Sequence, residues 1–263
     1  MTDRLREDEQ SRTYGSSFAE ILDGLFTDED AKALAEWAVR ECPTDGLVLE
    51  LGCGTGRVLA PVLRAGRRVE GWDLSEELLR RASERPGWAD AAAHGRASLH
   101  RADNRCPVEG GHRADVVLIV GGTLSMFSLE GQEAVLATAA SLVAPTGRVL
   151  VETHHRVRVD WVHRAGPTGD LLFDLPGGPM VRTRSQWDTV TGAWTLSHEW
   201  NGPDGLPRTA EESSTVLTDT ERDAAALRAG LRRQALTDRH GAARPHVGSA
   251  QAWITYSPDE RKS

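Results

Sequence analysis

Cysteine is scarce in this chain, and its three cysteines, Cys42, Cys53 and Cys106, include no CxxC pair. An odd number of thiols at these spacings indicates neither a disulfide framework nor a zinc knuckle. We therefore expect a reducing, cytoplasmic location and no bound metal.

Long apolar runs are also absent, so the sequence predicts no membrane partner. The first ten residues, MTDRLREDEQ, are charged and lack the apolar stretch of a signal peptide. Basic residues number 31 against 39 acidic ones, which gives a net charge of -8. Proteins that grip nucleic acid usually present a basic surface, so the composition argues against a nucleic-acid partner.

The 263 residues, 39% of them hydrophobic, suit one large domain or a domain with an insertion. Residues 1–44 form an N-terminal segment, predicted as a short helix over 16–26 and a longer one from Thr27 to about Cys42. Thr27 suits the N-cap because three acidic residues follow it, and Pro43 stops the helix.

Strands and helices alternate over the core, residues 45–154. The predicted strands are 47–51, 67–73, 97–103, 114–120 and 147–154, with helices between them, one of which is capped by Ser75 and another of which lies near 130–143. Such alternation is typical of a parallel sheet covered on both faces. We expect an α/β, Rossmann-like, seven-stranded and mostly parallel sheet, completed by the chain's last strands.

The pattern changes over residues 155–217, which are rich in Gly, Pro, Thr and Trp. Strands 181–189 and 193–200 predict an antiparallel hairpin whose buried face carries Trp187, Trp194 and Trp200, and 206–219 adds a strand. This β insertion is predicted to roof a substrate site or to pair two copies in a homodimer. Residues 218–263 return to the core with a helix, begun by a Thr218–Glu221 capping box, and strands 231–238 and 250–257, of which the last is antiparallel.

The stretch VLELGCGTGR (48–57) is a glycine-rich loop after a buried strand. The dinucleotide fingerprint G-x-G-x-x-G requires a third glycine where this chain has Arg57, and no GK[ST] of a phosphate loop is present. Glu50 is awkward beside a pyrophosphate but suits a cationic ligand. S-adenosylmethionine (SAM) carries an ammonium and a sulfonium and no phosphate.

On these residues the chain resembles the class I SAM-dependent methyltransferases. Their first motif reads here Glu50-Leu51-Gly52-Cys53-Gly54-Thr55-Gly56. The resemblance implies that Asp73, with Leu74 beside it, binds the ribose, and that Asp103 lies near the adenine amino group. It also implies contacts from Ala102 and Asn104 and from Val120, Gly121 and Gly122 after the fourth strand. Each residue has a structural alternative: Asp73 as a helix cap, Asp103 as a turn residue, Glu50 as a buried structural carboxylate, and Cys53 as a small loop residue rather than a nucleophile.

The methyl acceptor is less clearly marked. The (D/N)PP(Y/F) sequence of nucleic-acid N-methyltransferases is missing, and Gly121-Gly122-Thr123-Leu124 resembles a small-molecule variant with glycine in place of asparagine. The insertion and the tyrosine-containing N-terminal segment are similar in outline to amino-sugar N-methyltransferases and glycine N-methyltransferase-like enzymes. Tyr14 is therefore a candidate for contact with the cofactor or the acceptor, or else an anchor for the N-terminal helix.

His154 ends the fifth strand, where ligands bind in such sheets, and is a candidate catalytic base. The residues after it, His155, Arg156, Arg158, His163 and Arg164, form either an acceptor pocket or, as we favour for the arginines, an ordinary charged loop. The sequence thus predicts a SAM-dependent methyltransferase acting on N or O of a small molecule, in specialised metabolism of the antibiotic type. The alternative is a SAM-binding protein of this fold with a non-methylating catalytic or regulatory role.

Overall fold

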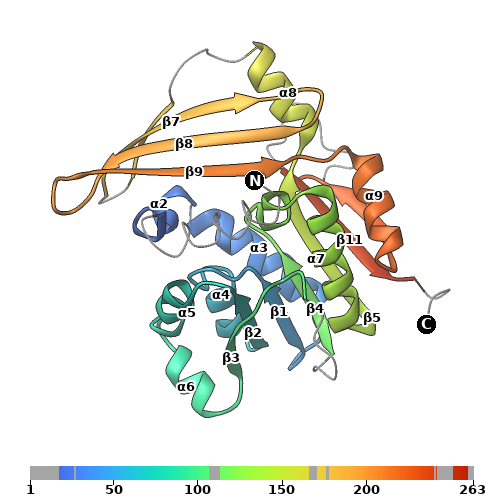
Figure 1. Ribbon diagram of the computed structural model, residues 1–263. Coiled ribbons are helices and arrows are strands. Elements are labelled where there is room, and N and C mark those ends of the chain that lie inside the picture. The colour runs from blue at the N-terminus through green and yellow to red at the C-terminus, as the bar shows by residue number, and fades with distance from the viewer. Residues whose placement is uncertain are drawn as a thin grey trace.

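The computed structural model describes residues 18–26, 28–106, 113–165, 171–175, 178–239, 241 and 251–259. Seven strands form the main sheet in the order β10-β11-β5-β4-β1-β2-β3 (Figure 1). Their bounds are β1 Leu47–Leu51, β2 Arg68–Asp73, β3 Ala97–Arg101, β4 Ala114–Ile119, β5 Val143–His154, β10 Leu231–Thr237 and β11 Gln251–Pro258. All neighbouring pairs are parallel except those of β11, which runs antiparallel to both β5 and β10. This confirms the predicted Rossmann-like sheet.

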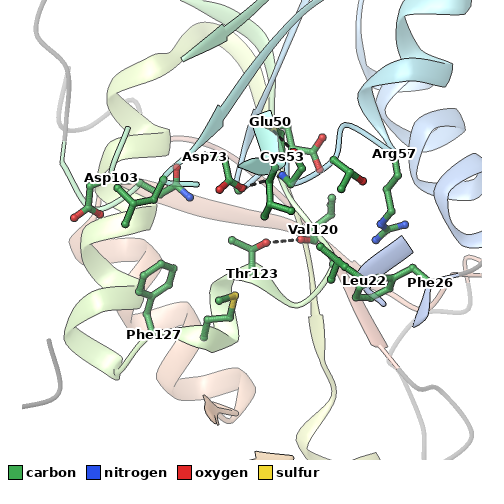
Figure 2. A pocket seen from close by; sticks show the side chains of 18 of the residues that line it. Leu22, Phe26, Glu50, Cys53, Arg57, Asp73, Asp103, Val120, Thr123 and Phe127 are labelled. Atoms are coloured by element: carbon green, nitrogen blue, oxygen red, sulfur yellow. Dashed lines mark hydrogen bonds between the residues drawn. The ribbon is translucent and has the colours of Figure 1, made fainter. Parts of the chain in front are cut away.

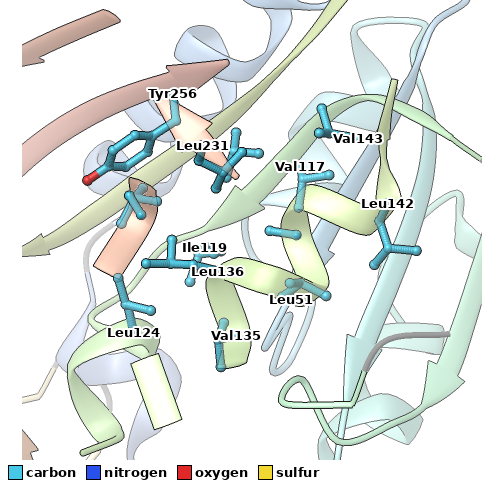
Figure 3. Close-up of a cluster of buried hydrophobic side chains, with 14 of the residues drawn as sticks. Leu51, Val117, Ile119, Leu124, Val135, Leu136, Leu142, Val143, Leu231 and Tyr256 are labelled. Atoms are coloured by element: carbon cyan, nitrogen blue, oxygen red, sulfur yellow. The ribbon is translucent and has the colours of Figure 1, made fainter. Parts of the chain in front are cut away.

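Apolar residues on both faces of the central strands explain the layered arrangement. Leu49 and Leu51 of β1 pack on one side with α7 (Leu129–Leu142) and α9 (Asp219–Arg228), whereas Val48 packs on the other. That second side is covered by α3 (Asp28–Glu41), α4 (Leu59–Arg64) and α6 (Trp88–Ala93). Figure 3 shows the first cluster, in which the side chains of β4 meet those of α7 and of the last strands. A sheet buried on both faces reads as near-continuous apolar strands, as these do.

Capping residues fix where several helices begin. The Ser75 hydroxyl accepts from Leu78 N at the start of α5 (Glu76–Ser83), and Thr218 and Glu221 form the predicted capping box of α9. Helix α6 was not predicted. The predicted single helix over 16–26 is a 3-10 turn, η1 (Phe18–Glu20), followed by the short α2 (Leu22–Leu25). Gly24, a poor helix former, lies against Leu175 there, and Thr27 lies outside the described residues.

A second, four-stranded antiparallel sheet has the order β6-β7-β8-β9. Its strands are β6 Leu171–Asp174, β7 Met180–Trp187, β8 Ala193–Asn201 and β9 Pro207–Thr215. Trp187 pairs directly with Trp194, and Trp200 is buried, so the predicted tryptophan face exists and points inward. The opposite face mixes the exposed charged residues Arg182 and Glu199 with the exposed apolar side chains of Leu172 and Met180.

The charged loop expected after His154 is wrong, because residues Arg156–Ala165 form helix α8. Tertiary contacts hold it: the Arg156 guanidinium donates to the carbonyls of Thr189 and Val216, and the Trp187 indole N–H donates to Asp160 at 2.8 Å. Its apolar residues do recur at helical spacing, as Val157 with Trp161 and Val159 with Val162 show, but the arginines and histidines among them favoured a charged loop.

None of the helices in the described ranges is both long enough and apolar enough to cross a membrane.

Candidate active site

A cavity of about 110 Å³ lies at the carboxyl ends of the first four strands, where open α/β sheets bind ligands. Figure 2 shows Asp103 and Phe127 at one end of it and Arg57 and Phe26 at the other, with Asp73 between them. Ten residues predicted as cofactor contacts line it: Glu50, Gly52, Cys53, Gly54, Asp73, Leu74, Asp103, Asn104, Val120 and Gly121. Gly56, Ala102 and Gly122 are not among its described lining residues.

The glycine loop brings the backbone close to the cavity. Gly52 and Gly54 have φ of +78° and +53°, a region that side chains rarely adopt. A Cβ on Gly52 would meet Thr123 Cγ2 at 2.5 Å. Gly56 has a packing role instead, since its Cβ would lie 3.1 Å from Ala82 of α5.

Asp73 ties the end of β2 to this loop. One carboxylate oxygen accepts from Gly54 N and the other from Ser75 N, both at 2.9 Å. Burial raises the pKa of this carboxyl, and the N–H donors of Ser75, Gly54 and Leu74 oppose the rise. The N-cap of α5 is Ser75 and not Asp73, so the Asp73 carboxylate joins the glycine loop to the turn after β2. It also lines the cavity and keeps lone pairs for a ligand hydroxyl.

Glu50 is a buried carboxylate, 3% exposed, and its Oε2 has no hydrogen-bond partner among the described residues. Burial raises its pKa to about 8; the Arg57 charge opposes this and Asp73 adds to it. Arg57 also keeps a buried nitrogen, Nη1, without a described partner, and its guanidinium lies 4.3 Å from the Phe26 ring centroid. Burying a polar atom without a hydrogen-bond partner costs free energy. A ligand with a positive group for Glu50 Oε2 and a negative group for Arg57 Nη1 would remove this cost at both atoms.

Glu152 of β5 is hydrogen-bonded to the turn after β4. Its carboxylate accepts from Gly121 N at 2.6 Å and from Gly122 N at 3.3 Å. Burial raises the Glu152 pKa, and the bond from Gly121 and the charge of Arg57 oppose that rise. This bond orients the turn that forms the cavity floor, a role that the sequence did not suggest.

His154 lies outside the cavity lining, behind the same turn. Its Nε2 sits 3.0 Å from where a Gly122 Cβ would be, and its ring packs edge-on against Trp194 at 4.8 Å. Burial lowers the pKa of His154, and the Glu212 carboxylate opposes that effect. A neutral imidazole is thus favoured, one residue removed from the cavity. Tyr14 lies outside the described residues.

The other candidates after β5 are engaged in helix α8. His163 bonds to the Val159 carbonyl and the Ser185 hydroxyl, both at 2.8 Å, and Arg164 lies 4.0 Å from Asp160. Arg158 packs on the Trp161 ring at 4.8 Å. His163 and Arg158 thus have contacts within the protein, whereas the side chain of Arg164 is 70% exposed. Within the described ranges, no three His, Cys, Asp or Glu side chains are grouped to hold a metal ion.

Sequence reasoning missed several lining residues: Leu22, Phe26, Thr55, Arg57, Leu78, Arg105, Thr123, Met126 and Phe127. Arg57 was visible in the motif, but only as a missing glycine. The apolar members come from α2 and the residue after it, from α5, and from η2 (Thr123–Met126) and the residue after it. The approach of these segments to the sheet edge depends on tertiary packing.

Comparisons with known proteins agree with this geometry. Residues 48–147 match the family model described as a methyltransferase domain. Over 68 residues the chain is 34% identical to the Bacillus subtilis protein YqeM, a stretch that covers 26% of this chain and only 28% of that relative.

Solved structures share the fold. The CcbJ methyltransferase of Streptomyces caelestis superposes with a TM-score of 0.76 at 23% identity, covering 94% of this chain and 98% of that one. A SAM-bound amino pentose methyltransferase of Micromonospora echinaspora gives 0.66 at 20% identity, covering 91% and 95%.

Proposed function

We propose that this protein transfers a methyl group from SAM to N or O of a small molecule, supported by the match of residues 48–147 to a methyltransferase domain and by the fold shared with a SAM-bound methyltransferase. The observation that carries the proposal is the pair of unpartnered buried groups on Glu50 and Arg57 beside the glycine loop. SAM supplies a methyl group on a sulfonium, which is already a good leaving group.

The residues of this chain fit such a ligand. Glu50 suits the ammonium and Arg57 the carboxylate of the methionine portion, because each keeps a buried polar atom without a described partner. Asp73 suits the ribose hydroxyls, since its carboxylate is already oriented by two backbone N–H groups. What remains for the protein is to place the acceptor and exclude water, and an amine that is already neutral needs no base.

The acceptor site is assigned to the region between the cavity and the second sheet. Figure 1 shows that sheet lying above α2. Leu22 and Phe26 line the cavity, and Phe18 and Leu22 pack with Val181 and Trp200 beneath the sheet. A cavity whose edge is covered by these packed apolar side chains favours a small acceptor over a macromolecule.

The net charge of -8 supports the same choice against nucleic acid. The free thiols Cys42, Cys53 and Cys106 support a cytoplasmic location. The amino pentose enzyme that shares this fold takes part in calicheamicin biosynthesis, which supports a role in specialised metabolism. The proposal includes a homodimer in which the outer face of the second sheet, where Leu172 and Met180 are exposed, pairs two copies.

The test is methyl transfer from SAM labelled in its methyl group to fractionated extract of the source organism. Label in small-molecule fractions is expected, lost in Asp73→Ala and kept in Asp90→Ala, which changes an exposed carboxylate on α6. Label confined to macromolecules would contradict the small-molecule acceptor. Tight SAM binding with no label in any fraction would favour the non-methylating alternative.

A further inference from the structure

The carboxylate of Asp103, expected at the adenine amino group, is already occupied. Arg105 donates to it from its backbone N at 3.0 Å, from Nε at 2.9 and 3.2 Å, and from Nη2 at 2.7 Å. Side-chain exposure of Arg105 is 11% and of Asp103 24%, so the pair is largely shielded from water. A carboxylate has about four acceptor positions, and one neighbouring residue fills most of them here.

The next residue, Asn104, has a side-chain acceptor that no described residue occupies. Asn104 is 8% exposed, lines the same cavity, and its Oδ1 is buried with no hydrogen-bond partner among the described residues. A carboxamide presents an acceptor and a donor side by side, which is the complement of an adenine edge with its amino donor and ring-nitrogen acceptor. A carboxylate presents acceptors alone.

The cavity places a base at this end. Arg57 and Glu50, which suit the charged methionine portion, lie away from Asp103, and Asp73 lies between (Figure 2). Phe127, Met126 and Leu74 line the cavity and supply apolar surface for a planar ring. This inference rests on the proposed function: we propose that the side chain of Asn104, and not that of Asp103, accepts a hydrogen bond from the amino group of the SAM adenine.

Asp103 and Arg105 then act as positioning residues. Their ion pair closes a turn in which Cys106 N also donates to the Asp103 carbonyl at 2.9 Å. Ala102 N donates to the Asp73 carbonyl at 3.1 Å, which joins this turn to the end of β2. Asn104 lies between these two anchors, so its backbone is fixed before a ligand arrives.

The experiment measures binding by calorimetry, with two probes and no acceptor. S-adenosylhomocysteine (SAH) is compared with its analogue that carries purine in place of adenine and so lacks only the amino group. The intact protein is expected to bind the analogue about tenfold more weakly, the effect of one hydrogen bond. In Asn104→Leu, and in Asn104→Ala, SAH falls to the affinity of the analogue and the ratio approaches one.

Asp103→Asn is the matched control. It weakens the ion pair with Arg105 and is expected to lower both affinities by the same factor, so that the tenfold ratio stays. A ratio that survives both Asn104 variants, or one that Asp103→Asn abolishes, would overturn the assignment. If the unchanged protein binds neither probe, the proposed function itself fails. Thermal unfolding of each variant shows that it is folded.

Discussion

Glu50→Gln is expected to raise the stability of the ligand-free protein at high pH while weakening its hold on the cofactor. Burial raises the pKa of Glu50 from 4.5 to about 8 in the folded protein. At about 1.4 kcal/mol per pKa unit, ionising this carboxyl in the folded state costs ~5 kcal/mol.

The sign follows from the direction of the shift. A raised pKa means that the folded state binds the proton more tightly, so Glu50 favours folding below pH 4.5 and that contribution is lost as the pH rises through about 8. Glutamine does not titrate. The free energy of unfolding of the variant minus that of the unchanged protein should therefore increase between pH 5 and pH 9, by up to ~5 kcal/mol.

Urea unfolding at a series of pH values, followed by tryptophan fluorescence, measures this difference. Glu152 also has a raised pKa, but it is present in both proteins and cancels in the comparison. The charge of Asp73 acts on Glu50, so their mutual repulsion is part of the difference that the substitution removes. Saturating SAH should remove most of the difference, because its ammonium pairs with the Glu50 carboxylate. Stability curves that stay parallel across the pH range would refute the assignment of a strained, unpartnered carboxylate.

Three further substitutions test separate parts of the structure. Arg57→Leu should weaken SAH binding by ~2 kcal/mol in calorimetry, because a buried charged donor is lost; unchanged affinity would exclude a carboxylate contact. Gly52→Ala should lower the thermal unfolding temperature more than Gly66→Ala. Both glycines have positive φ, but only a Cβ at position 52 would lie against Thr123. Equal decreases in unfolding temperature would contradict the close approach of Gly52 to Thr123. Thr218→Ala should cost ~1 kcal/mol of unfolding free energy by removing the α9 cap, with SAH affinity as the unaffected control.

The main sheet was predictable because its signals are local and strong. β1 matches its predicted bounds, and the capping residues Ser75 and Thr218 mark their helices in the sequence. Helix α8 was missed although its apolar residues recur at helical spacing, because its arginines and histidines favoured a loop. Where α8 packs is not visible in the sequence, since Arg156 and Asp160 contact residues far along the chain. Local patterns carry no information on such partners.

The site divides in the same way. Residues on strand ends, such as Glu50 and Asp73, could be assigned to one edge of the sheet from topology alone. The occupation of Asp103 by its neighbour Arg105, and the withdrawal of His154 behind Gly122, depend on side-chain directions that spacing does not give. What these positions bind stays a prediction until ligand binding is measured.

The cluster formed by Phe18, Leu22, Val181 and Trp200 makes the N-terminal helices and the second sheet interdependent, although about 160 residues separate them in the chain. Exchanging either segment with that of a related protein would leave an apolar surface facing a foreign one. Chimeric proteins made to alter acceptor choice should therefore fold when the N-terminal helices and the second sheet come from the same parent. Over evolutionary time, substitutions at Phe18 and at Trp200 should be inherited as a pair.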